Sequence, residues 1–224
     1  MFIGHFGAAL AAKRAAPRVS LGWLFAASQL PDLVWPVLVL AGVERVRIAP
    51  GDTAFTPLAF EHYPWSHSLL AAFVWAALLG AIYVVTHRNG SGSLILGALV
   101  VSHWVLDWIT HRPDLPLYPG GTERFGLGLW NSVPATLVVE CALFLGALWL
   151  YARHTAARDR AGRIGFWALA ILLLIIEVAN VFSPPPPSVN AVAMSGLALW
   201  LLVLWAGWAD RHRDRRGAVA PDSR

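Results

Sequence analysis

Long apolar runs alternate with short polar segments along most of the chain. Six of these runs are long enough to cross the hydrocarbon core of a bilayer, which takes about 20 residues of helix. They lie near residues 20–42, 68–86, 93–110, 132–152, 164–182 and 189–208. The segments between them are rich in Pro, Gly, Arg or His. The pattern predicts an all-α protein, a polytopic membrane helical bundle of about six transmembrane helices.

The composition agrees with a membrane protein. Hydrophobic residues make up 57% of the chain, charged residues only 13%, and the mean hydropathy is +0.57. Lys13, Arg14 and Arg18 follow the first apolar residues instead of preceding them, so we expect no removable signal peptide. The single cysteine, Cys141, has no partner for an internal disulfide.

The distribution of basic residues predicts an orientation. When the two terminal segments are counted with the loops, alternate segments outside the spans sum to 13 Lys and Arg residues on one side and 4 on the other. The positive-inside rule then places both termini in the cytoplasm and the loops 43–67, 110–131 and 183–188 outside. The sequence pI is about 9.8, but the arginines flank apolar spans, so we expect no nucleic-acid partner.

The stretch Ser-His-Trp-Val-Leu-Asp-Trp-Ile-Thr-His places polar side chains inside an apolar span. His103 and Asp107 are four residues apart, so on a helix they share one face and could bind one ion. His111 continues this face by another turn, although Pro113 should end the helix near it. The alternative is a His–Asp hydrogen bond that only packs two spans together.

A second polar cluster precedes the second span. Pro64 predicts a turn between His62 and His67, and Ser66 is expected to cap the following helix, leaving His67 in its first turn. The positive end of the helix dipole favours neutral imidazole there, which is the form that binds a metal. The alternative is an interfacial loop whose histidines face water.

Acidic residues also fall within the spans. Asp32 lies in the middle of the first span, where a charged side chain costs about 3 kcal/mol, and Pro31 should kink the helix beside it. A metal ligand is one interpretation; a carboxylate that is protonated or paired with an arginine is the other. We interpret Glu140 and Glu177 as supporting or structural groups, because neither has a ligand partner nearby in sequence.

The order and spacing of these motifs are similar to those of a known family. The chain resembles the membrane-bound metal-dependent hydrolases, the YdjM-like inner-membrane proteins, over about residues 1–130. The matching blocks are G-H at 4–5, L-P-D at 30–32, H-x3-S-H-S-L-L at 62–70, and S-H-x3-D-x2-T at 102–110 followed by L-P-L-Y-P. The chain departs from the family pattern at Val34, where a second acid is common, at Tyr63-Pro64 in place of Arg-Gly, and at Ser66 in place of Thr.

The resemblance implies a metal-dependent hydrolase in the inner membrane of a bacterial or archaeal cell. The matching positions are His5, Asp32, His62, His67, His103 and Asp107. His5 precedes the first span, so residues 2–12 are expected to form a short re-entrant or interfacial helix that approaches the site. The expected organisation is a metal-site domain at 1–152, an additional two-helix hairpin at 153–210 and a basic cytoplasmic tail at 211–224.

The favoured hypothesis is one metal site in the outer half of the bundle. His62, His67, His103 and Asp107 are its main expected ligands, and Asp32 comes next. Nitrogen and oxygen ligands without thiolate suit Zn, with Mn or Fe as alternatives. Water activated there would attack an ester or phosphoester of a lipid or another amphipathic substrate.

Three points stay open at this stage. Glu61, Asp32 or His111 could each serve as the general base. Histidines and acids within spans also mark ion pathways, so a metal-ion or proton transporter is an alternative function. A non-catalytic scaffold, whose polar groups lock helices together, is the third.

Overall fold

The computed structural model describes residues 1–216, most of which are helical. Within these residues, five helices are long and apolar enough to cross a membrane, or six if a bent pair counts as one span. The expected all-α polytopic bundle is therefore confirmed. Residues 217–224 of the expected basic tail lie outside the described part.

The helices are α1 (Ile3–Ala12), α2 (Leu21–Ser28), α3 (Leu30–Leu40), α4 (Pro64–His67), α5 (Leu69–His87), α6 (Gly90–Thr110), α7 (Val133–His154), α8 (Arg160–Phe182), α9 (Val189–Leu197) and α10 (Leu199–Arg211), with a 3-10 turn η1 (Leu129–Asn131). The strands are β1 (Arg45–Ile48), β2 (Leu58–His62), β3 (Leu115–Pro116), β4 (Arg124–Phe125), β5 (Thr155–Ala157) and β6 (Arg213–Arg215). The strands form three antiparallel pairs, β1–β2, β3–β4 and β5–β6.

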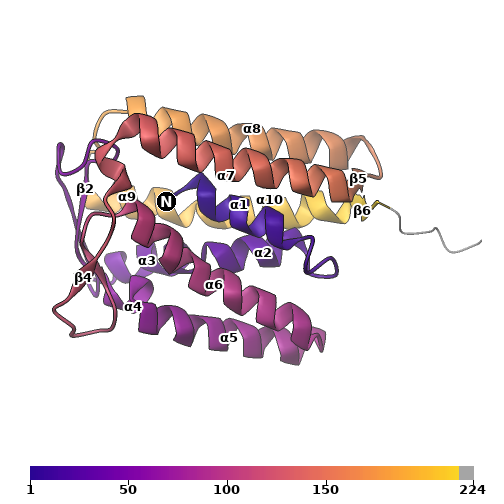
Figure 1. Ribbon diagram of the computed structural model, residues 1–224, viewed down its shortest axis with the longest axis horizontal. Helices are drawn as coiled ribbons and strands as arrows, with labels where there is room; N and C mark the ends of the chain where they lie inside the picture. Colours follow the sequence, from indigo (N-terminus) through magenta and orange to yellow (C-terminus); the bar gives the residue numbers. More distant parts are fainter. Residues whose placement is uncertain (217–224) are drawn as a thin grey trace, which may run out of the picture.

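The helices pack side by side, with α1 in the middle of the bundle (Figure 1). Helix α1 packs against α7, α10 against α2 and α8, and α5 against α6. Two strand pairs, β1–β2 and β3–β4, lie at one end of the bundle, which we call the hairpin end. The β5–β6 pair lies at the other end, together with the loop that joins α1 to α2; we call this the basic end.

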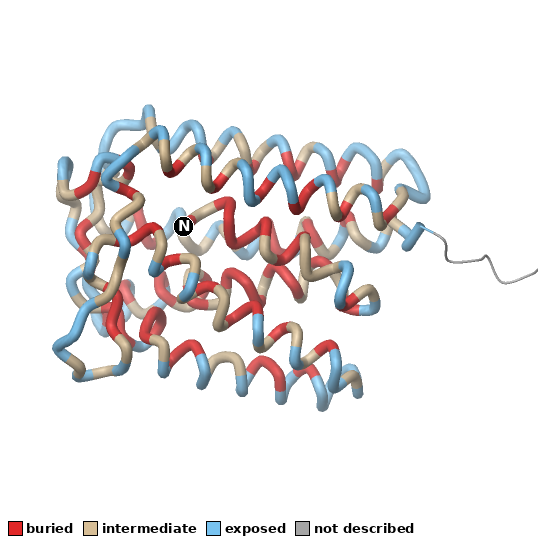
Figure 2. The backbone as a smooth tube through the Cα atoms, viewed as in Figure 1, coloured by how far each residue is buried: buried red, intermediate tan, exposed pale blue. Residues whose placement is uncertain are grey.

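Helix α1 is buried along most of its length, as Figure 2 shows. A Cβ added at Gly7 would lie 3.2 Å from backbone atoms of Leu143 and Phe144, so the missing side chain lets α1 approach the α7 backbone closely. The expectation of a short helix within 2–12, buried against protein, is confirmed. Such a helix is too short to span but carries its polar residues into the interior.

The first span is broken. Helices α2 and α3 are bent by 56° at Gln29, and Pro31 occupies the first turn of α3, as its fixed φ and missing N–H favour. Asp32 lies in the same turn, where the helix dipole stabilises a carboxylate. The predicted kink therefore coincides with a complete helix break, which directs the start of α3 towards the interior.

One hydrophobic cluster unites the two halves of the chain. It contains Phe6 from α1, Phe25 from α2, Phe166 from α8 and Ala206 from α10. Residues 153–210 thus pack into the same core as residues 1–152. The outward faces of the helices remain exposed and apolar, as at Phe73, which suits contact with lipid tails.

Candidate metal centre

Five of the sequence-predicted site residues meet near the hairpin end. His5 comes from α1, Asp32 from α3, His67 from α4, and His103 and Asp107 from α6. They form two groups, His5–His103–Asp107 and Asp32–His67–His103, within each of which the ligand atoms lie within 4.8 Å of one another. His103 belongs to both groups, so the two are parts of one cluster.

The orientation of His103 leaves one ring nitrogen free for an ion. Its Nδ1 lies 2.7 Å from the Ser28 carbonyl oxygen. A carbonyl oxygen can only accept a hydrogen bond, so Nδ1 is the donor and carries the proton. In the neutral ring Nε2 then has a lone pair, and it faces Asp107 Oδ2 at 3.1 Å without forming a hydrogen bond. A lone pair that faces a carboxylate is repulsive unless a cation lies between them, so these two groups fit a metal ion.

A hydrogen-bond chain gives His67 the same polarity. The Ser66 hydroxyl donates to Glu44 Oε2 at 2.6 Å, because an ionised carboxylate can only accept. Ser66 Oγ therefore accepts from His67 Nδ1 at 2.7 Å, which leaves Nε2 of the neutral ring unprotonated. This Nε2 lies 3.2 Å from Asp32 Oδ1, within hydrogen-bond distance, so a second imidazole nitrogen faces a carboxylate.

Ser66 is not the helix cap that its position predicts. The chain forms the separate short helix α4 over 64–67, and Ser68 caps α5 by accepting from the Ala71 amide at 3.1 Å. The expected cap was wrong because the Pro64 turn is itself helical, which moves the start of the span two residues further. Ser66 is thereby available to orient His67.

His5, from α1, contacts both Asp107 and His103 in the cluster. Its Nε2 lies 3.0 Å from Asp107 Oδ1, and its ring stacks on that of His103 at a centroid distance of 3.7 Å. The Met1 nitrogen lies 2.6 Å from the same Oδ1. Glu140 on α7 accepts from the Phe2 and Gly4 amides at 2.7 and 3.2 Å, so it fixes the start of α1, in agreement with a structural role.

His111 lies at the edge of the cluster, at the C-terminal end of α6. Its Nε2 is 4.0 Å from Asp107 Oδ1, and its Nδ1 is 2.9 Å from Asp114 Oδ1. The Tyr63 hydroxyl donates to the same Asp114 oxygen at 2.6 Å. Burial, and then the Asp114 carboxylate, raise the pKa of Tyr63 well above its usual value, so the phenol stays protonated.

The sequence profile of a known family matches residues 1–183, which include every member of this cluster. The chain belongs to the YdjM inner membrane protein family. The match extends past residue 130 to the end of α8 and crosses the expected domain boundary at residue 152. No curated protein and no solved structure matched the chain.

Two residues considered for the site of this YdjM family member lie apart from the cluster. His62 ends strand β2 opposite Arg45 and lines a separate cavity of about 230 Å³. Glu61 pairs with Arg47 at 2.9 Å on the exposed surface of the same strand pair. The residues before Pro64 are extended, so His62 and His67 do not share a helix turn. His62 lines the separate cavity, whereas His67 lies in the cluster.

Three groups that hydrogen-bond to the site residues are hard to recognise from the sequence. Glu44 follows the first span with no motif around it, and the Ser28 carbonyl is a backbone group. Asp114 follows His111 by three residues and could have been noticed, although Pro113 between them hides the helical spacing. These three groups orient ligands and the edge histidine through hydrogen bonds.

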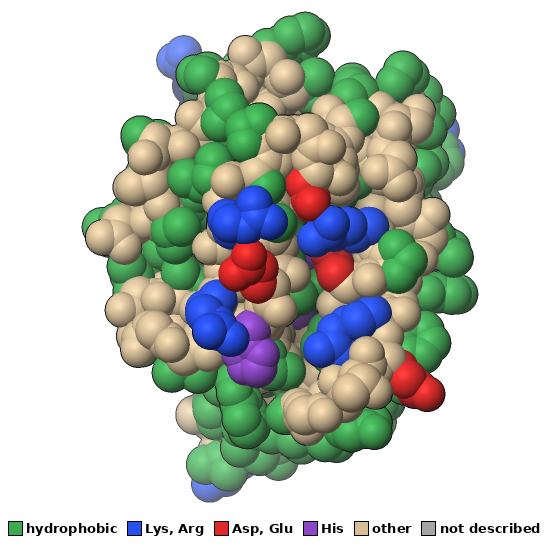
Figure 3. All heavy atoms as spheres, turned by 90° about the vertical axis from the view of Figure 1, so that its left-hand side faces the viewer, with side chains coloured by type: hydrophobic (Ala, Val, Ile, Leu, Met, Phe, Trp, Pro, Cys, Tyr) green, Lys and Arg blue, Asp and Glu red, His purple; other side chains and the backbone are tan. Residues whose placement is uncertain are grey.

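A cavity of about 310 Å³ reaches the cluster from the hairpin end of this YdjM family bundle. Asp32 lines it together with aromatic residues Trp35, Phe55, Phe60 and Trp130. The Asp32 side chain is 26% exposed, whereas that of Asp107 is 3% exposed, so Asp32 marks the open side of the cluster. Charged side chains of both signs gather on the face of the hairpin end, which Figure 3 shows end-on. Arg112, which follows α6, forms an ion pair with Asp52 at 2.6 Å.

Proposed function

We propose that this chain is a membrane-embedded metal-dependent hydrolase. One observation carries the proposal: the Nε2 atoms of His103 and His67 lie 3.1 and 3.2 Å from carboxylate oxygens of Asp107 and Asp32, and the cluster opens into a cavity at Asp32. The Met1 nitrogen at 2.6 Å from Asp107 Oδ1 supplies one positive charge to the two carboxylates, and the imidazole nitrogens aimed at them are ligands suited to a divalent cation. His5 completes the proposed ligand set.

The donors fit Zn best, with Mn or Fe as alternatives, because the set contains imidazole and carboxylate but no thiolate. A cation held there supplies Lewis-acid polarisation and makes water a stronger nucleophile near neutral pH. His111 is the proposed proton acceptor, because Asp114 and Tyr63 fix its ring while Nε2 points towards the cluster. Asp32, on the open side, would meet the substrate first.

The proposed substrate is a lipid or another amphipathic ester or phosphoester. An adjoining cavity of about 600 Å³ is lined by α3, α8, α9 and α10 and shares lining residues with the cavity at Asp32, among them Phe2, Trp35 and Asn180. Away from the cluster it is lined by apolar side chains such as Leu172 and Leu201. We propose that a hydrocarbon chain of the substrate lies in this groove while its polar linkage reaches Asp32.

The buried core supports a hydrolase over an ion transporter. A transport site must be reachable from each side of the membrane in turn. Between the cluster and the basic end lie fully buried apolar side chains, including Phe6, Phe25 and Leu96, in a close-packed core. The cavity that opens at Asp32 is at the hairpin end, as a catalytic site approached from one side requires.

The protein purified in detergent is expected to hold a transition metal in stoichiometric amount and to cleave long-chain phosphoesters. Chelation should remove both properties, and added Zn²⁺, Mn²⁺ or Fe²⁺ should restore them, because the cluster provides coordination that water replaces poorly. Elemental analysis and release of the cleaved group measure the two effects. A protein without bound metal, whose activity is also unchanged by chelation, would contradict the proposal.

Filling the groove is expected to separate long from short substrates. Ala198→Trp places a large ring in the lining, so kcat/KM for a long-chain phosphoester should fall on the order of tenfold or more, because several buried methylenes are lost. A short-chain analogue should be cleaved as before. The control is Leu204→Trp, at a lipid-facing position of α10 outside the lining. An equal fall in kcat/KM for the long-chain and the short-chain substrate would show that the hydrocarbon chain does not bind in this groove.

The basic end is proposed to face the cytoplasm, from the Lys and Arg asymmetry. A cysteine at Pro185, in a Cys141→Ser background, should then react with an impermeant maleimide in intact cells, and one at Arg18 only after permeabilisation. Met1 lies inside the bundle beside Asp107. The proposed cytoplasmic side is therefore defined by the segment that follows α1 and by the described segment that follows α10, and not by Met1. The reverse labelling pattern would invert the topology.

A further inference from the structure

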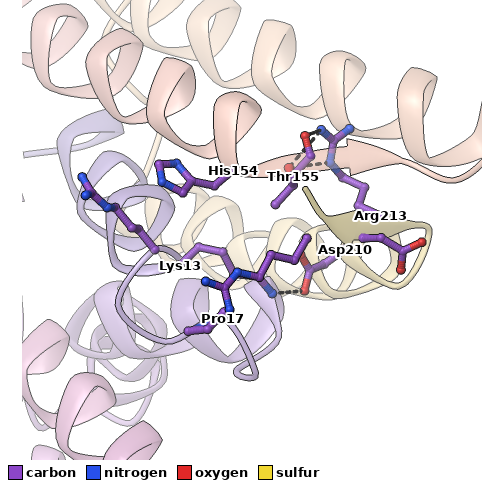
Figure 4. Close-up of a pocket in the computed structure, with 9 residues that line it drawn as sticks. Lys13, Pro17, His154, Thr155, Asp210 and Arg213 are labelled. Carbon is purple, nitrogen blue, oxygen red and sulfur yellow. Dashed lines mark hydrogen bonds and ion pairs between the residues drawn. The ribbon is translucent and has the colours of Figure 1, made fainter. Parts of the chain in front are cut away.

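The basic end contains another cavity, remote from the metal cluster. Its volume is about 330 Å³, and its lining includes Lys13, Arg14, His154, Arg213 and Arg215 (Figure 4). These residues come from the loop after α1, the end of α7 and the segment after α10. Three chain segments distant in sequence thus bring cationic side chains to one hollow at the ends of apolar helices.

The acids in this cavity are already neutralised. Asp210 Oδ2 accepts from Lys13 Nζ at 2.6 Å, and its Oδ1 accepts from the Tyr151 hydroxyl at 2.8 Å. Asp214 lies 3.4 Å from Arg158 Nε. Both carboxylates therefore have a cationic partner, and the remaining arginines give the hollow an excess of positive charge.

One of these arginines is fixed and two are free to bind. Arg213 donates from Nε and Nη2 to Thr155 Oγ1 at 3.1 and 3.0 Å, and its guanidinium stacks over the Phe166 ring at 4.5 Å. The side chains of Arg14 and Arg215 form no hydrogen bond or ion pair with any residue in the described range 1–216, although the backbone of both is hydrogen-bonded. Their guanidinium groups can each bind two oxygens of one phosphate.

We infer that this cavity binds the phosphate group of an anionic phospholipid. It lies where α1, α7 and α10 end, which in the proposed membrane placement is the level of lipid headgroups, and juxtamembrane cationic residues attract anionic lipids. The shared chemistry is a phosphate mono- or diester, which a soluble phosphate could also supply. The site is independent of the metal cluster and of the hydrolase proposal.

The test measures binding of a fluorescent phosphatidylglycerol to the full-length protein in neutral-lipid nanodiscs, with and without chelator. We expect saturable binding that metal removal leaves unchanged. Arg14→Gln with Arg215→Gln should weaken binding tenfold or more, whereas the control pair Arg18→Gln with Arg160→Gln, which removes the same charge outside the lining, should change it less than twofold. Neither pair removes a described side-chain contact, so folding is preserved.

The outcomes separate the sources of the ligand. No competition by millimolar inorganic phosphate supports a lipid headgroup, whereas complete displacement assigns the site to a soluble phosphate and overturns the lipid. Equal weakening by both variant pairs would show a general surface-charge effect and overturn the site. Equal binding of a fluorescent phosphatidylcholine would also overturn it, because that lipid carries no net charge.

Discussion

Asp107→Asn is expected to abolish metal binding and hydrolysis while the protein remains folded and inserted. The carboxylate lies between His5 Nε2 at 3.0 Å and His103 Nε2 at 3.1 Å, and the side chain is 3% exposed. The amide has nearly the same volume but removes the negative charge and one acceptor oxygen. Metal affinity should therefore fall by on the order of 100-fold or more, since even outer partners of ligands contribute 10- to 100-fold.

Elemental analysis, hydrolysis and the thermal stability of the purified variant distinguish this role from packing. If Asp107 only joined helices, the amide would preserve function, because it can bridge helices as a carboxylate does. Asp52→Asn is the control, since Asp52 pairs with Arg112 outside the cluster. Wild-type metal content in the Asp107 variant would remove this residue from the ligand set.

Substituting His103 and His62 is expected to give opposite results. His103→Ala should lose the metal and the activity, because His103 belongs to both ligand groups. His62→Ala should retain both, because His62 lines a separate cavity at the end of β2. Both histidines are expected ligands from the sequence, and only the structure separates them. This pair of variants therefore tests where the tertiary structure places each histidine.

His103 is 1% exposed, so its truncation leaves a cavity that can destabilise the fold. His103→Gln preserves most of the volume and should also lose the metal while melting close to the wild type. A His62→Ala protein that loses its metal, beside a His103→Gln protein that keeps it, would move the metal site from the α6 cluster to His62 and would remove His103 from the expected ligand set.

Helical periodicity made part of the site visible before folding. His103 and Asp107 share one face because four residues make about one turn of helix, and the structure places their ligand atoms 3.1 Å apart. The break at Pro31 and the burial of the helix that carries His5 could also be predicted, because both follow from local backbone constraints and from length. The place of His62 could not, because its direction depends on how β2 pairs with β1.

The groups that orient the ligands were invisible for a related reason. Glu44 reaches Ser66 across 22 residues, and Ser28 reaches His103 across 75. No spacing rule connects positions so far apart, since the first contact depends on how α4 packs beside α3, and the second on how α2 packs against α6. Yet these contacts decide which nitrogen of each imidazole is unprotonated, and so whether the residue can bind a metal.

The sequence by itself determined the membrane class, the spans and the polar residues that must find partners, because these follow from hydropathy, from the length of a bilayer-spanning helix and from the cost of burying charge. Only the tertiary structure decided which of those residues meet. It brought His5, Asp32 and His67 to the α6 pair, left His62 apart, and joined the segments at 13–14 and 213–215 into a second, cationic cavity. The physical reason is that hydropathy acts along the chain, whereas ligand geometry arises between helices that close packing brings together.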